Sequence, residues 1–306
     1  MEEFVLLHVG YQKTGSTWLQ RNVFSKENLG FGSNLDHENH DIYHDIVLRN
    51  EFTFDAESVG EKYSHYLEGF FKKSLVPVIS HESFSGDFIN GRYYGKQVAG
   101  RLKQAFPNSK VLITIREQKS FVLSAYLFYL FQDGIERIEH FIGVGKESPG
   151  FVPICRTEYL EYHHLYQTYC DLFGKENVLV LPFEKLKKDN NSFVKDILQF
   201  CNMNKIYPIN AEPANVNLSV GVLLIKRYFN HIARIGSYNR PPSILLRLAR
   251  KVIKGLEYFI PEAVNTYFKT NLQKYINEYV QSKFAESNLK LGNLIGIDLK
   301  QYGYQT

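Results

Sequence analysis

The sequence predicts an α/β protein with three layers, in which helices cover both faces of a central, mostly parallel sheet. Two observations lead to this prediction. Short apolar runs alternate with longer segments of helical periodicity, and the first apolar run ends in a glycine-containing loop that opens a helix. The 306 residues contain no internal repeat and no low-complexity segment. We therefore expect one domain over residues 1–306, with additional helices toward its C-terminal end.

Four apolar runs have the length and composition of buried strands, and they span residues 4–9, 76–80, 110–115 and 177–181. Residues 30–57 are polar and irregular. Helical periodicity is expected over residues 18–24, 57–71, 94–106, 117–131 and 157–173, and later near 189–202, 219–234, 243–256 and 262–286.

The composition excludes several classes of protein. With 44% hydrophobic and 22% charged residues, the chain can bury a sizeable core and is not a disordered tail. Its three cysteines show no paired spacing, which argues against a disulfide scaffold or a zinc cluster and fits a reducing compartment. The longest apolar-looking run, residues 121–131, is too short to cross a bilayer, and the first residues lack the basic start of a signal peptide. We therefore expect a cytoplasmic protein.

The net charge of +4 hides a local excess of positive charge. Between Glu212 and Glu257 there are eight Lys and Arg residues and no acidic residue, so the remainder of the chain carries −4. This block predicts a local anionic partner, and not general binding of nucleic acid. A basic amphipathic helix is expected over residues 244–256. Such a helix suits peripheral contact with the inner membrane surface or a polyanion, although a solvated face over the core is the alternative.

The loop after the first strand has the composition of a phosphate-binding loop. Gly10 and Gly15 have the separation of the glycines in G-x-x-x-x-G-K-[ST], and Thr17 stands at the hydroxyl position. Ser16 occupies the lysine position, and a lysine lies inside the loop instead, at Lys13. Backbone N–H groups can still hold phosphate oxygens, as in P-loop NTPase-like folds. Because a kinase uses its lysine and Mg²⁺ to neutralise a triphosphate, this loop favours a donor with less charge on the transferred group.

Residues 11–18, YQKTGSTW, resemble the Y-P-K-[ST]-G-[ST]-T-W loop of sulfotransferases that use 3′-phosphoadenosine 5′-phosphosulfate (PAPS), with Gln12 in place of the usual proline. The resemblance implies that Lys13 contacts the bridging oxygen of PAPS and that Trp18 stacks on its adenine, although a large core residue is the alternative for Trp18. It also implies that the phosphosulfate is held by the loop residues Lys13, Thr14, Gly15, Ser16 and Thr17.

A second pair of residues suits a phosphate monoester. Arg116 follows the third strand directly, and Ser124 lies about two turns along the next helix, so both side chains can face one direction. This pair is similar to the R-x(7)-S motif with which the family binds the 3′-phosphate. Residues 180–186 and 287–304 also resemble family segments, the latter in bacterial carbohydrate-type sulfotransferases. The resemblance therefore covers nearly the whole chain.

Two residues after the second strand are candidates for the catalytic base. A hydroxyl acceptor must lose its proton as it attacks sulfur, and a side chain can accept that proton. Glu82 resembles in position the base of heparan-type sulfotransferases, with Ser83 replacing the family's lysine, whereas a histidine such as His81 has this role in other branches. Neighbours along an extended segment point to opposite sides. We therefore expect either Glu82 or His81 to reach the acceptor.

The resemblance implies an enzyme of bacterial type that transfers a sulfuryl group from PAPS to a hydroxyl of a carbohydrate or glycolipid. Adenosine 3′,5′-bisphosphate (PAP) would be the product. We expect no requirement for a metal, because the transferred group carries less charge than a phosphoryl group. Two alternatives remain open: a P-loop kinase with a displaced lysine, and a non-catalytic module that binds a nucleotide or polyanion.

Overall fold

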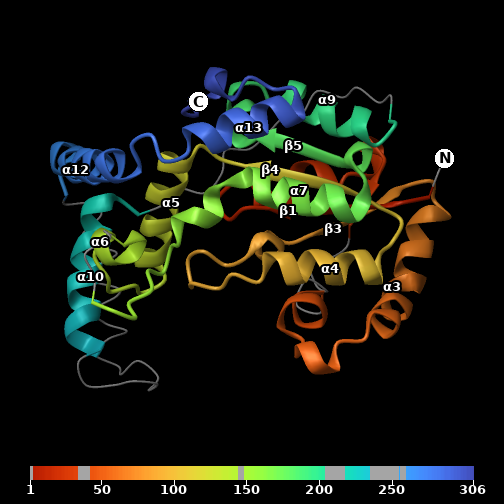
Figure 1. Cartoon of the computed structure of the whole chain (residues 1–306), viewed down its shortest axis with the longest axis horizontal. Helices are drawn as coiled ribbons and strands as arrows, with labels where there is room; N and C mark the ends of the chain where they lie inside the picture. Colours follow the sequence, from red (N-terminus) through yellow and green to blue (C-terminus); the bar gives the residue numbers. More distant parts are fainter. Residues whose placement is uncertain (1–2, 34–41, 144–147, 204–217, 235–254, 256–259) are drawn as a thin grey trace.

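The computed structural model describes residues 3–33, 42–143, 148–203, 218–234, 255 and 260–306. Five parallel strands form one sheet in the order β2-β3-β1-β4-β5. Helices flank this sheet (Figure 1), which confirms the predicted α/β architecture. The strands are β1 Val5–Gly10, β2 Phe31–Gly32, β3 Val76–Ser80, β4 Ser109–Ile115 and β5 Val178–Pro182.

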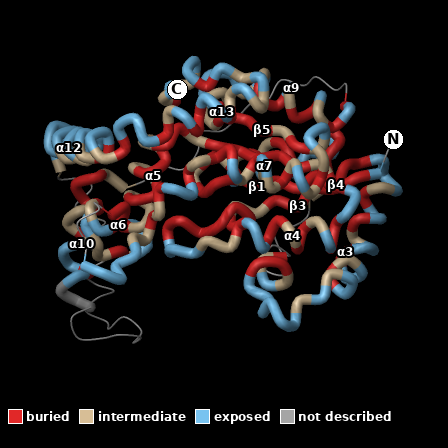
Figure 2. The backbone as a smooth tube through the Cα atoms, viewed as in Figure 1, coloured by how far each residue is buried: buried red, intermediate tan, exposed pale blue. Residues whose placement is uncertain are grey.

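The central strand β1 divides its side chains between two cores. Val5, Leu7 and Val9 join the larger core with residues of α4 (Gly95–Ala105), α5 (Gln118–Phe131) and α7 (Tyr162–Phe173). Leu6 joins a second core with residues of α1 (Ser16–Leu19), α8 (Phe183–Lys188) and α9 (Asn190–Phe200). This alternation follows from the two-residue period of a strand. Figure 2 shows buried strands enclosed by helices with exposed outer faces.

The helices have the following bounds: α1 Ser16–Leu19, α3 Ala56–Phe71, α4 Gly95–Ala105, α5 Gln118–Phe131, α6 Ile138–Ile142, α7 Tyr162–Phe173, α8 Phe183–Lys188, α9 Asn190–Phe200, α10 Val220–Arg234, α12 Glu262–Val280 and α13 Ala285–Ile295. After α1 the chain continues as a π-helical turn, Gln20–Phe24. The C-terminal helices α10 and α12 pack against α5 and against each other. They lie at the end of the molecule opposite α3 (Figure 1).

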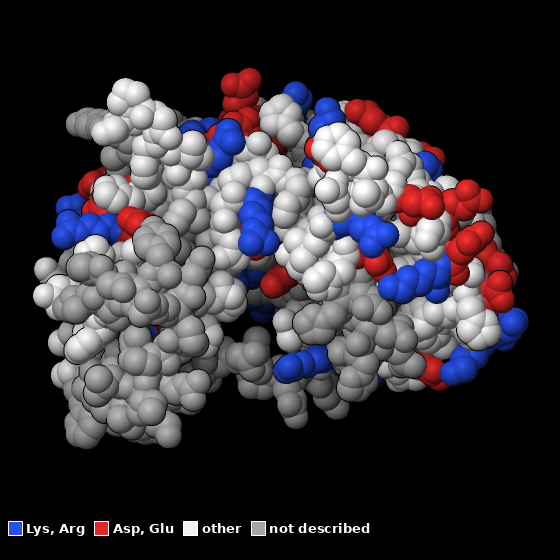
Figure 3. All heavy atoms as spheres, turned by 90° about the horizontal axis from the view of Figure 1, so that it is seen from below, with Lys and Arg blue, Asp and Glu red and all other residues white. Residues whose placement is uncertain are grey.

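Acidic side chains gather at one end of the face shown in Figure 3. This is the end that α3 occupies in Figure 1, and Glu57, Glu61 and Glu68 of α3 are exposed. Part of the negative charge outside residues 212–257 therefore lies on α3, at the opposite end of the molecule from α12.

Three expected elements differ from the structure. The irregular segment 30–57 contains the short edge strand β2, where a Cβ on Gly32 would lie 2.1 Å from Phe70, so only glycine lets the strand pack this closely. The helix expected over 157–173 begins as a separate 3₁₀ turn and becomes α7 only at Tyr162. The helix expected over 262–286 ends at Val280, because Gln281 has φ 28° and the chain turns before α13.

The predicted basic helix over residues 244–256 lies outside the described residues, apart from Gly255. No described helix combines the length and the apolar character needed to cross a membrane.

Candidate functional site

The order of the strands brings three chain segments to one edge of the sheet. Strand β1 lies between β3 and β4, with His8 opposite Ser80 and Gly10 opposite Thr114. The segments that follow these parallel strands therefore leave the sheet at the same edge. In open α/β sheets, ligands bind at this edge where the strand order reverses.

The loop between β1 and α1 has a backbone suited to an anion. Lys13 and Gly15 have φ values of 65° and 91°, and a left-handed residue before a helical one makes a concave group of N–H donors. A Cβ on Gly15 would lie 2.9 Å from Leu186, and one on Gly10 would lie 2.7 Å from the Ser16 hydroxyl. Both glycines are therefore required by close contacts around the loop.

A series of buried hydrogen bonds connects the loop to the strands of the sheet. The Thr14 hydroxyl donates to the carbonyl oxygen of Tyr11 and lies 2.9 Å from the Thr114 hydroxyl. Thr114 lies 3.2 Å from Nε2 of His8, whose Nδ1 lies 2.7 Å from the Ser80 hydroxyl. Burial lowers the pKa of His8 to about 3, so its ring is neutral at pH 7. These contacts tie the loop to β1, β3 and β4.

Sequence reasoning did not single out His8. The signal was a single polar side chain inside an otherwise apolar run, FVLLHV. A histidine on a strand buried on both faces needs partners for both ring nitrogens, and those partners come from the two neighbouring strands.

Arg116, at the end of β4, contacts the loop directly. Its Nη1 donates a hydrogen bond to the carbonyl oxygen of Lys13 at 3.0 Å, and its guanidinium carbon lies 5.2 Å from the centre of the Phe183 ring. Burial lowers the pKa of Arg116, and the nearby Glu184 raises it. The buried Nε atom of Arg116 makes no hydrogen bond with the described residues, and neither does the buried hydroxyl of Ser16. Unpaired buried donors of this kind are costly unless a ligand accepts from them.

Lys13 lies between charges of both signs. Its Nζ is 4.5 Å from the centre of the Phe128 ring on α5. Burial lowers the pKa of Lys13, Glu82 raises it and Arg116 lowers it. The ammonium group is therefore close enough to both side chains to be affected by their charges.

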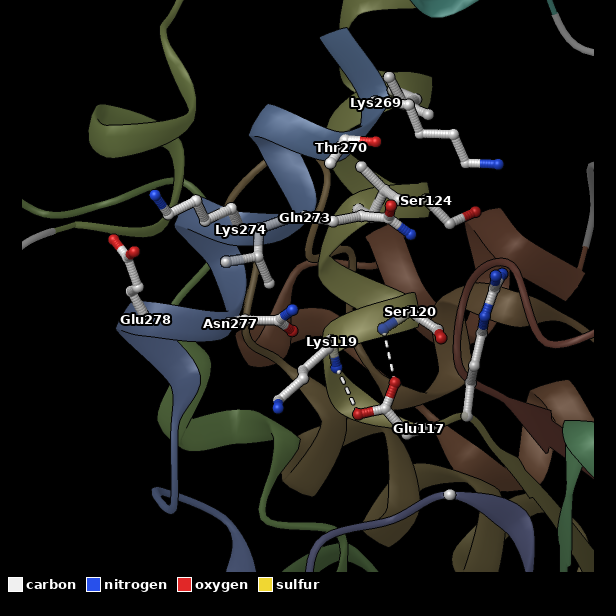
Figure 4. Close-up of a pocket in the computed structure, with 15 residues that line it drawn as sticks. Glu117, Lys119, Ser120, Ser124, Lys269, Thr270, Gln273, Lys274, Asn277 and Glu278 are labelled. Atoms are coloured by element: carbon white, nitrogen blue, oxygen red, sulfur yellow. Dashed lines mark hydrogen bonds between the residues drawn. The ribbon is translucent and has the colours of Figure 1, made fainter. Parts of the chain in front are cut away.

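A cleft of about 930 Å³ opens between α5 and α12 (Figure 4). Arg116, Ser120 and Ser124 line its α5 side. The carboxylate of Glu117 accepts hydrogen bonds from the backbone N–H groups of Lys119 and Ser120 at 2.9 and 2.8 Å, which caps the start of α5. Arg116 and Ser124 thus share one cleft, and Arg116 also contacts the phosphate loop.

The segment after β5 adds a cation that sequence reasoning missed. Nζ of Lys187 lies 4.8 Å from the centre of the Phe183 ring, on which Arg116 also packs. Burial lowers the pKa of Lys187, and so does Arg116. Glu184 accepts hydrogen bonds from the Glu117 N–H and the Tyr304 hydroxyl, both at 3.1 Å. The C-terminal residues therefore reach the surroundings of Arg116.

The segment after β3 places Glu82 near Lys13. Glu82 begins a 3₁₀ turn, Glu82–Ser85, and is half-buried. Burial raises its pKa, Lys13 lowers it and Asp87 raises it, and the result lies above the usual value for glutamate. Gln12 donates a hydrogen bond to Asp87 at 2.8 Å, so the residue that replaces the usual proline links the loop to the segment just after this turn.

His81 takes part in the same turn. Its Nδ1 accepts a hydrogen bond from the Ser83 N–H at 3.1 Å, and its ring stacks on Tyr43 with 4.9 Å between ring centres. His81 therefore caps the turn that carries Glu82.

The two remaining loop residues of the expected site differ in exposure. Thr17 is exposed, whereas Trp18 is half-buried and packs against the core that also contacts Phe183.

One described cluster has metal-ligand residue types. Glu161, His163 and His164 place ligand atoms within 4.8 Å of one another. His163 lies 2.8 Å from the Ser287 hydroxyl, and burial lowers its pKa to about 4. These residues lie at the start of α7 and do not line the cleft.

Residues 5–213, more than half of the chain, match the family model of the sulfotransferase domain. The chain belongs to the sulfotransferase family. This membership confirms the resemblance found in the sequence.

The fold of this sulfotransferase is similar to that of a solved sulfotransferase. A sulfotransferase from Alicyclobacillus acidocaldarius aligns over 99% of this chain and 100% of its own, with 15% identity and a TM-score of 0.56. Mouse sulfotransferase SULT7A1 complexed with PAP aligns over 99% and 89%, with 14% identity and a TM-score of 0.40. The sulfotransferase domain from the curacin biosynthetic pathway aligns over 82% and 97%, with 12% identity and a TM-score of 0.37. No curated protein matches the sequence.

Most residues expected to bind PAPS lie together in this sulfotransferase. Lys13 and Arg116 are in direct contact, and Ser124 lines the same cleft as Arg116. Glu82 is close enough to Lys13 for each to affect the pKa of the other.

Proposed function

We propose that this sulfotransferase transfers a sulfuryl group from PAPS to a hydroxyl of a carbohydrate or glycolipid, and that PAP is the product. The observation that carries the proposal is the hydrogen bond from Arg116 to the carbonyl of Lys13, with Ser124 in the same cleft. It joins the phosphate loop to a cation that shares a cleft with a hydroxyl, and a second phosphate could bind to this pair.

The residues fit the 5′-phosphosulfate as well as the 3′-phosphate. The buried Ser16 hydroxyl and the Nε of Arg116 have no partner among the described residues. The loop backbone is concave at Gly15, and a side chain there would collide with Leu186. Lys13 and Lys187 add positive charge near Arg116, which adds to the effect of burial in lowering the pKa of both. We propose that Thr14 and Thr17 complete the loop and that Trp18 contacts the adenine.

Bound PAPS would supply an activated sulfuryl group and a phosphate leaving group. Glu82 accepts the proton of the acceptor hydroxyl while the acceptor oxygen forms its bond to sulfur. The bond between sulfur and the bridging oxygen breaks at the same time, and the Lys13 ammonium offsets the charge that develops on that oxygen. A base with a raised pKa is suited to this step, because it holds the proton more firmly.

Several observations favour Glu82 over His81 as the base. His81 accepts the hydrogen bond that caps the turn, and its ring stacks on Tyr43. These two contacts give the ring a structural role in the turn. Glu82 is instead coupled in charge to Lys13.

A carbohydrate acceptor is supported by the resemblance of residues 287–304 to carbohydrate-type sulfotransferases. Tyr93 and Tyr159 also form an aromatic pair with 4.3 Å between ring centres, and Tyr159 is exposed. An exposed aromatic side chain such as Tyr159 suits the apolar face of a sugar ring. A cytoplasmic location with membrane contact through residues 244–256 stays a prediction, which binding to anionic lipid vesicles would test.

The test of the proposed function is transfer of radiolabelled sulfate from PAPS by the purified protein, with a panel of glycans and glycolipids as acceptors. We expect a labelled product that depends on Glu82. A protein stabilised by ATP with Mg²⁺ and not by PAP would support the kinase alternative. Salt-sensitive binding to anionic glycan without any transfer would support a non-catalytic module.

A further inference from the structure

The cleft beside Arg116 has two walls of different origin. The α5 wall carries Arg116, Ser120 and Ser124, whereas α12 supplies the opposite wall with Lys269, Thr270, Gln273, Lys274 and Asn277. Helix α12, Glu262–Val280, lies beyond residues 5–213 that match the family. The second wall is therefore a feature of this chain that the matched region does not contain.

The cleft is richer in positive than in negative charge. Four cations line it, Arg116, Lys119, Lys269 and Lys274, against the two carboxylates Glu117 and Glu278. The Glu117 carboxylate is already bonded to backbone N–H groups at the start of α5. Lys269 makes no ion pair or hydrogen bond with the part of the chain that the structure describes. The cleft therefore suits an anionic ligand.

The side chains of α12 point in two directions. Lys269 and Gln273 extend toward Ser124, whereas Lys274 extends toward Glu278 (Figure 4). Lys269 and Gln273 are four residues apart and so share one face of the helix. Helix α12 packs against α5, which keeps this face opposite Ser124.

We propose that Lys269 and Gln273 are specificity-determining residues that donate hydrogen bonds to the nucleotide 3′-phosphate. This inference rests on the proposed function, in which Arg116 and Ser124 hold that phosphate from the α5 wall. A phosphate monoester has a charge near −2 and three strong acceptor oxygens, more than one guanidinium and one hydroxyl can satisfy. The Lys269 ammonium and the Gln273 amide would donate to the oxygens on the opposite side.

The proposal makes the 3′-phosphate a bridge between α5 and α12. Nucleotides that lack this phosphate would bind at the loop, and they would gain nothing from the 3′-phosphate contacts of Arg116 and Ser124 or from α12. The ratio of the Kd for 5′-AMP to the Kd for PAP therefore reports on all contacts with the 3′-phosphate, because the two ligands differ only in that group. The contribution of α12 is the change in this ratio between the unmodified protein and a variant of α12.

The test is calorimetric binding of PAP and 5′-AMP to the full chain and to variants at exposed positions, which folding should tolerate. We expect Lys269→Ala to lower the preference for PAP about tenfold and Lys269→Arg to retain most of it. Gln273→Glu, which is nearly isosteric, should lower the preference at least as much, because its carboxylate repels the phosphate. Lys290→Ala on α13 removes the same charge from outside the cleft, and we expect it to leave the ratio unchanged.

The outcomes separate this inference from the proposed function. If the unmodified protein does not prefer PAP to 5′-AMP, the proposed 3′-phosphate site itself is wrong. If it prefers PAP and the Lys269 and Gln273 variants keep that preference, the inference about α12 is wrong and the proposed function stands. The inference would also be overturned if Lys290→Ala lost as much of the preference for PAP as Lys269→Ala does. It would be overturned as well if Lys269→Ala changed only the KM of the acceptor.

Discussion

The guanidinium of Arg116 donates a hydrogen bond to the carbonyl oxygen of Lys13 at 3.0 Å. The two residues are 103 positions apart, and they meet because β4 lies beside β1 in the sheet. The contact joins the loop that is expected to bind the 5′-phosphosulfate to the residue expected to bind the 3′-phosphate. One ligand that carries both groups would therefore be held by a single, connected structure.

The loop conformation requires glycine at position 15. Gly15→Ala should destabilise the protein by about 1–3 kcal/mol, because alanine disfavours φ 91° and its Cβ would lie 2.9 Å from Leu186. We also expect PAP binding to be lost. Gly100→Ala is a matched control, since it lies in helix α4 with no atom near the added methyl group, and it should be neutral or slightly stabilising. Urea denaturation and calorimetry measure both effects, and equal behaviour of the two variants would contradict this prediction.

Burial of neutral His8 should make stability depend on pH. The folded-state pKa of His8 is about 3, below the unfolded value of about 6.5. The unfolded state therefore binds one proton more between these values, so the stabilisation is present above pH 6.5 and is lost as the pH falls. The expected slope is about 1.4 kcal/mol per pH unit.

Chemical denaturation of the unmodified protein and His8→Phe at several pH values between 4.5 and 7.5 isolates this slope. The difference in unfolding free energy between them should shrink as the pH falls. Thr114→Val removes a partner of His8 but keeps the imidazole, so it should retain the slope. A difference that is constant with pH would show that His8 is not buried as a neutral ring.

Glu82 is expected to accept the acceptor proton. Glu82→Gln should lower kcat at least about 100-fold, which is the usual contribution of a general base, and should change PAP affinity little. His81→Asn keeps a side-chain acceptor for the Ser83 N–H and should retain most of the activity. Steady-state kinetics with the best acceptor, together with PAP titrations, test this assignment. A larger loss of kcat in His81→Asn than in Glu82→Gln would show that His81, and not Glu82, is the catalytic base.

The pH profile tests the environment of Glu82. Its pKa lies above the usual value for glutamate, and Asp87 contributes to this increase. Activity should fall on the acid side as Glu82 takes a proton, at a higher pH than for an ordinary glutamate. Asp87→Asn removes a negative charge, so the acid limb of kcat/KM should move to lower pH. Asp171→Asn on α7, where Asp171 contacts Gln167, is the control and should leave the acid limb in place. An acid limb that does not move in Asp87→Asn would show that Asp87 does not affect the pKa of Glu82.

The sequence predicted those parts of the fold that depend on local pattern. Four strands and the phosphate loop follow from apolar runs and glycine spacing, and the structure contains them. The two-residue strand β2 could not be predicted, because it exists only by pairing with β3 and by the close approach of Gly32 to Phe70. The end of α12 after Val280 depends on the conformation of Gln281, which the helical pattern of the sequence does not predict.

The residues of the candidate site also divide into those that local sequence patterns predict and those that depend on tertiary contacts. Lys13, Arg116 and Ser124 belong to motifs with fixed spacing, so their proximity could be anticipated. His8 and Lys187 act through partners on other strands and helices, and no local pattern identifies them. The α12 wall depends on the packing of α12 against α5, which follows from tertiary structure alone.

The central claim is that the phosphate loop and Arg116 form one site for a nucleotide with two phosphate-bearing positions. Calorimetric titration of PAP into the unmodified protein and Arg116→Ala tests it most directly. We expect PAP to bind the unmodified protein and its affinity to fall roughly 10- to 100-fold in the variant, because a charged hydrogen-bond donor to the ligand is removed. Unchanged PAP affinity in Arg116→Ala, with the fold intact by circular dichroism, would contradict the claim.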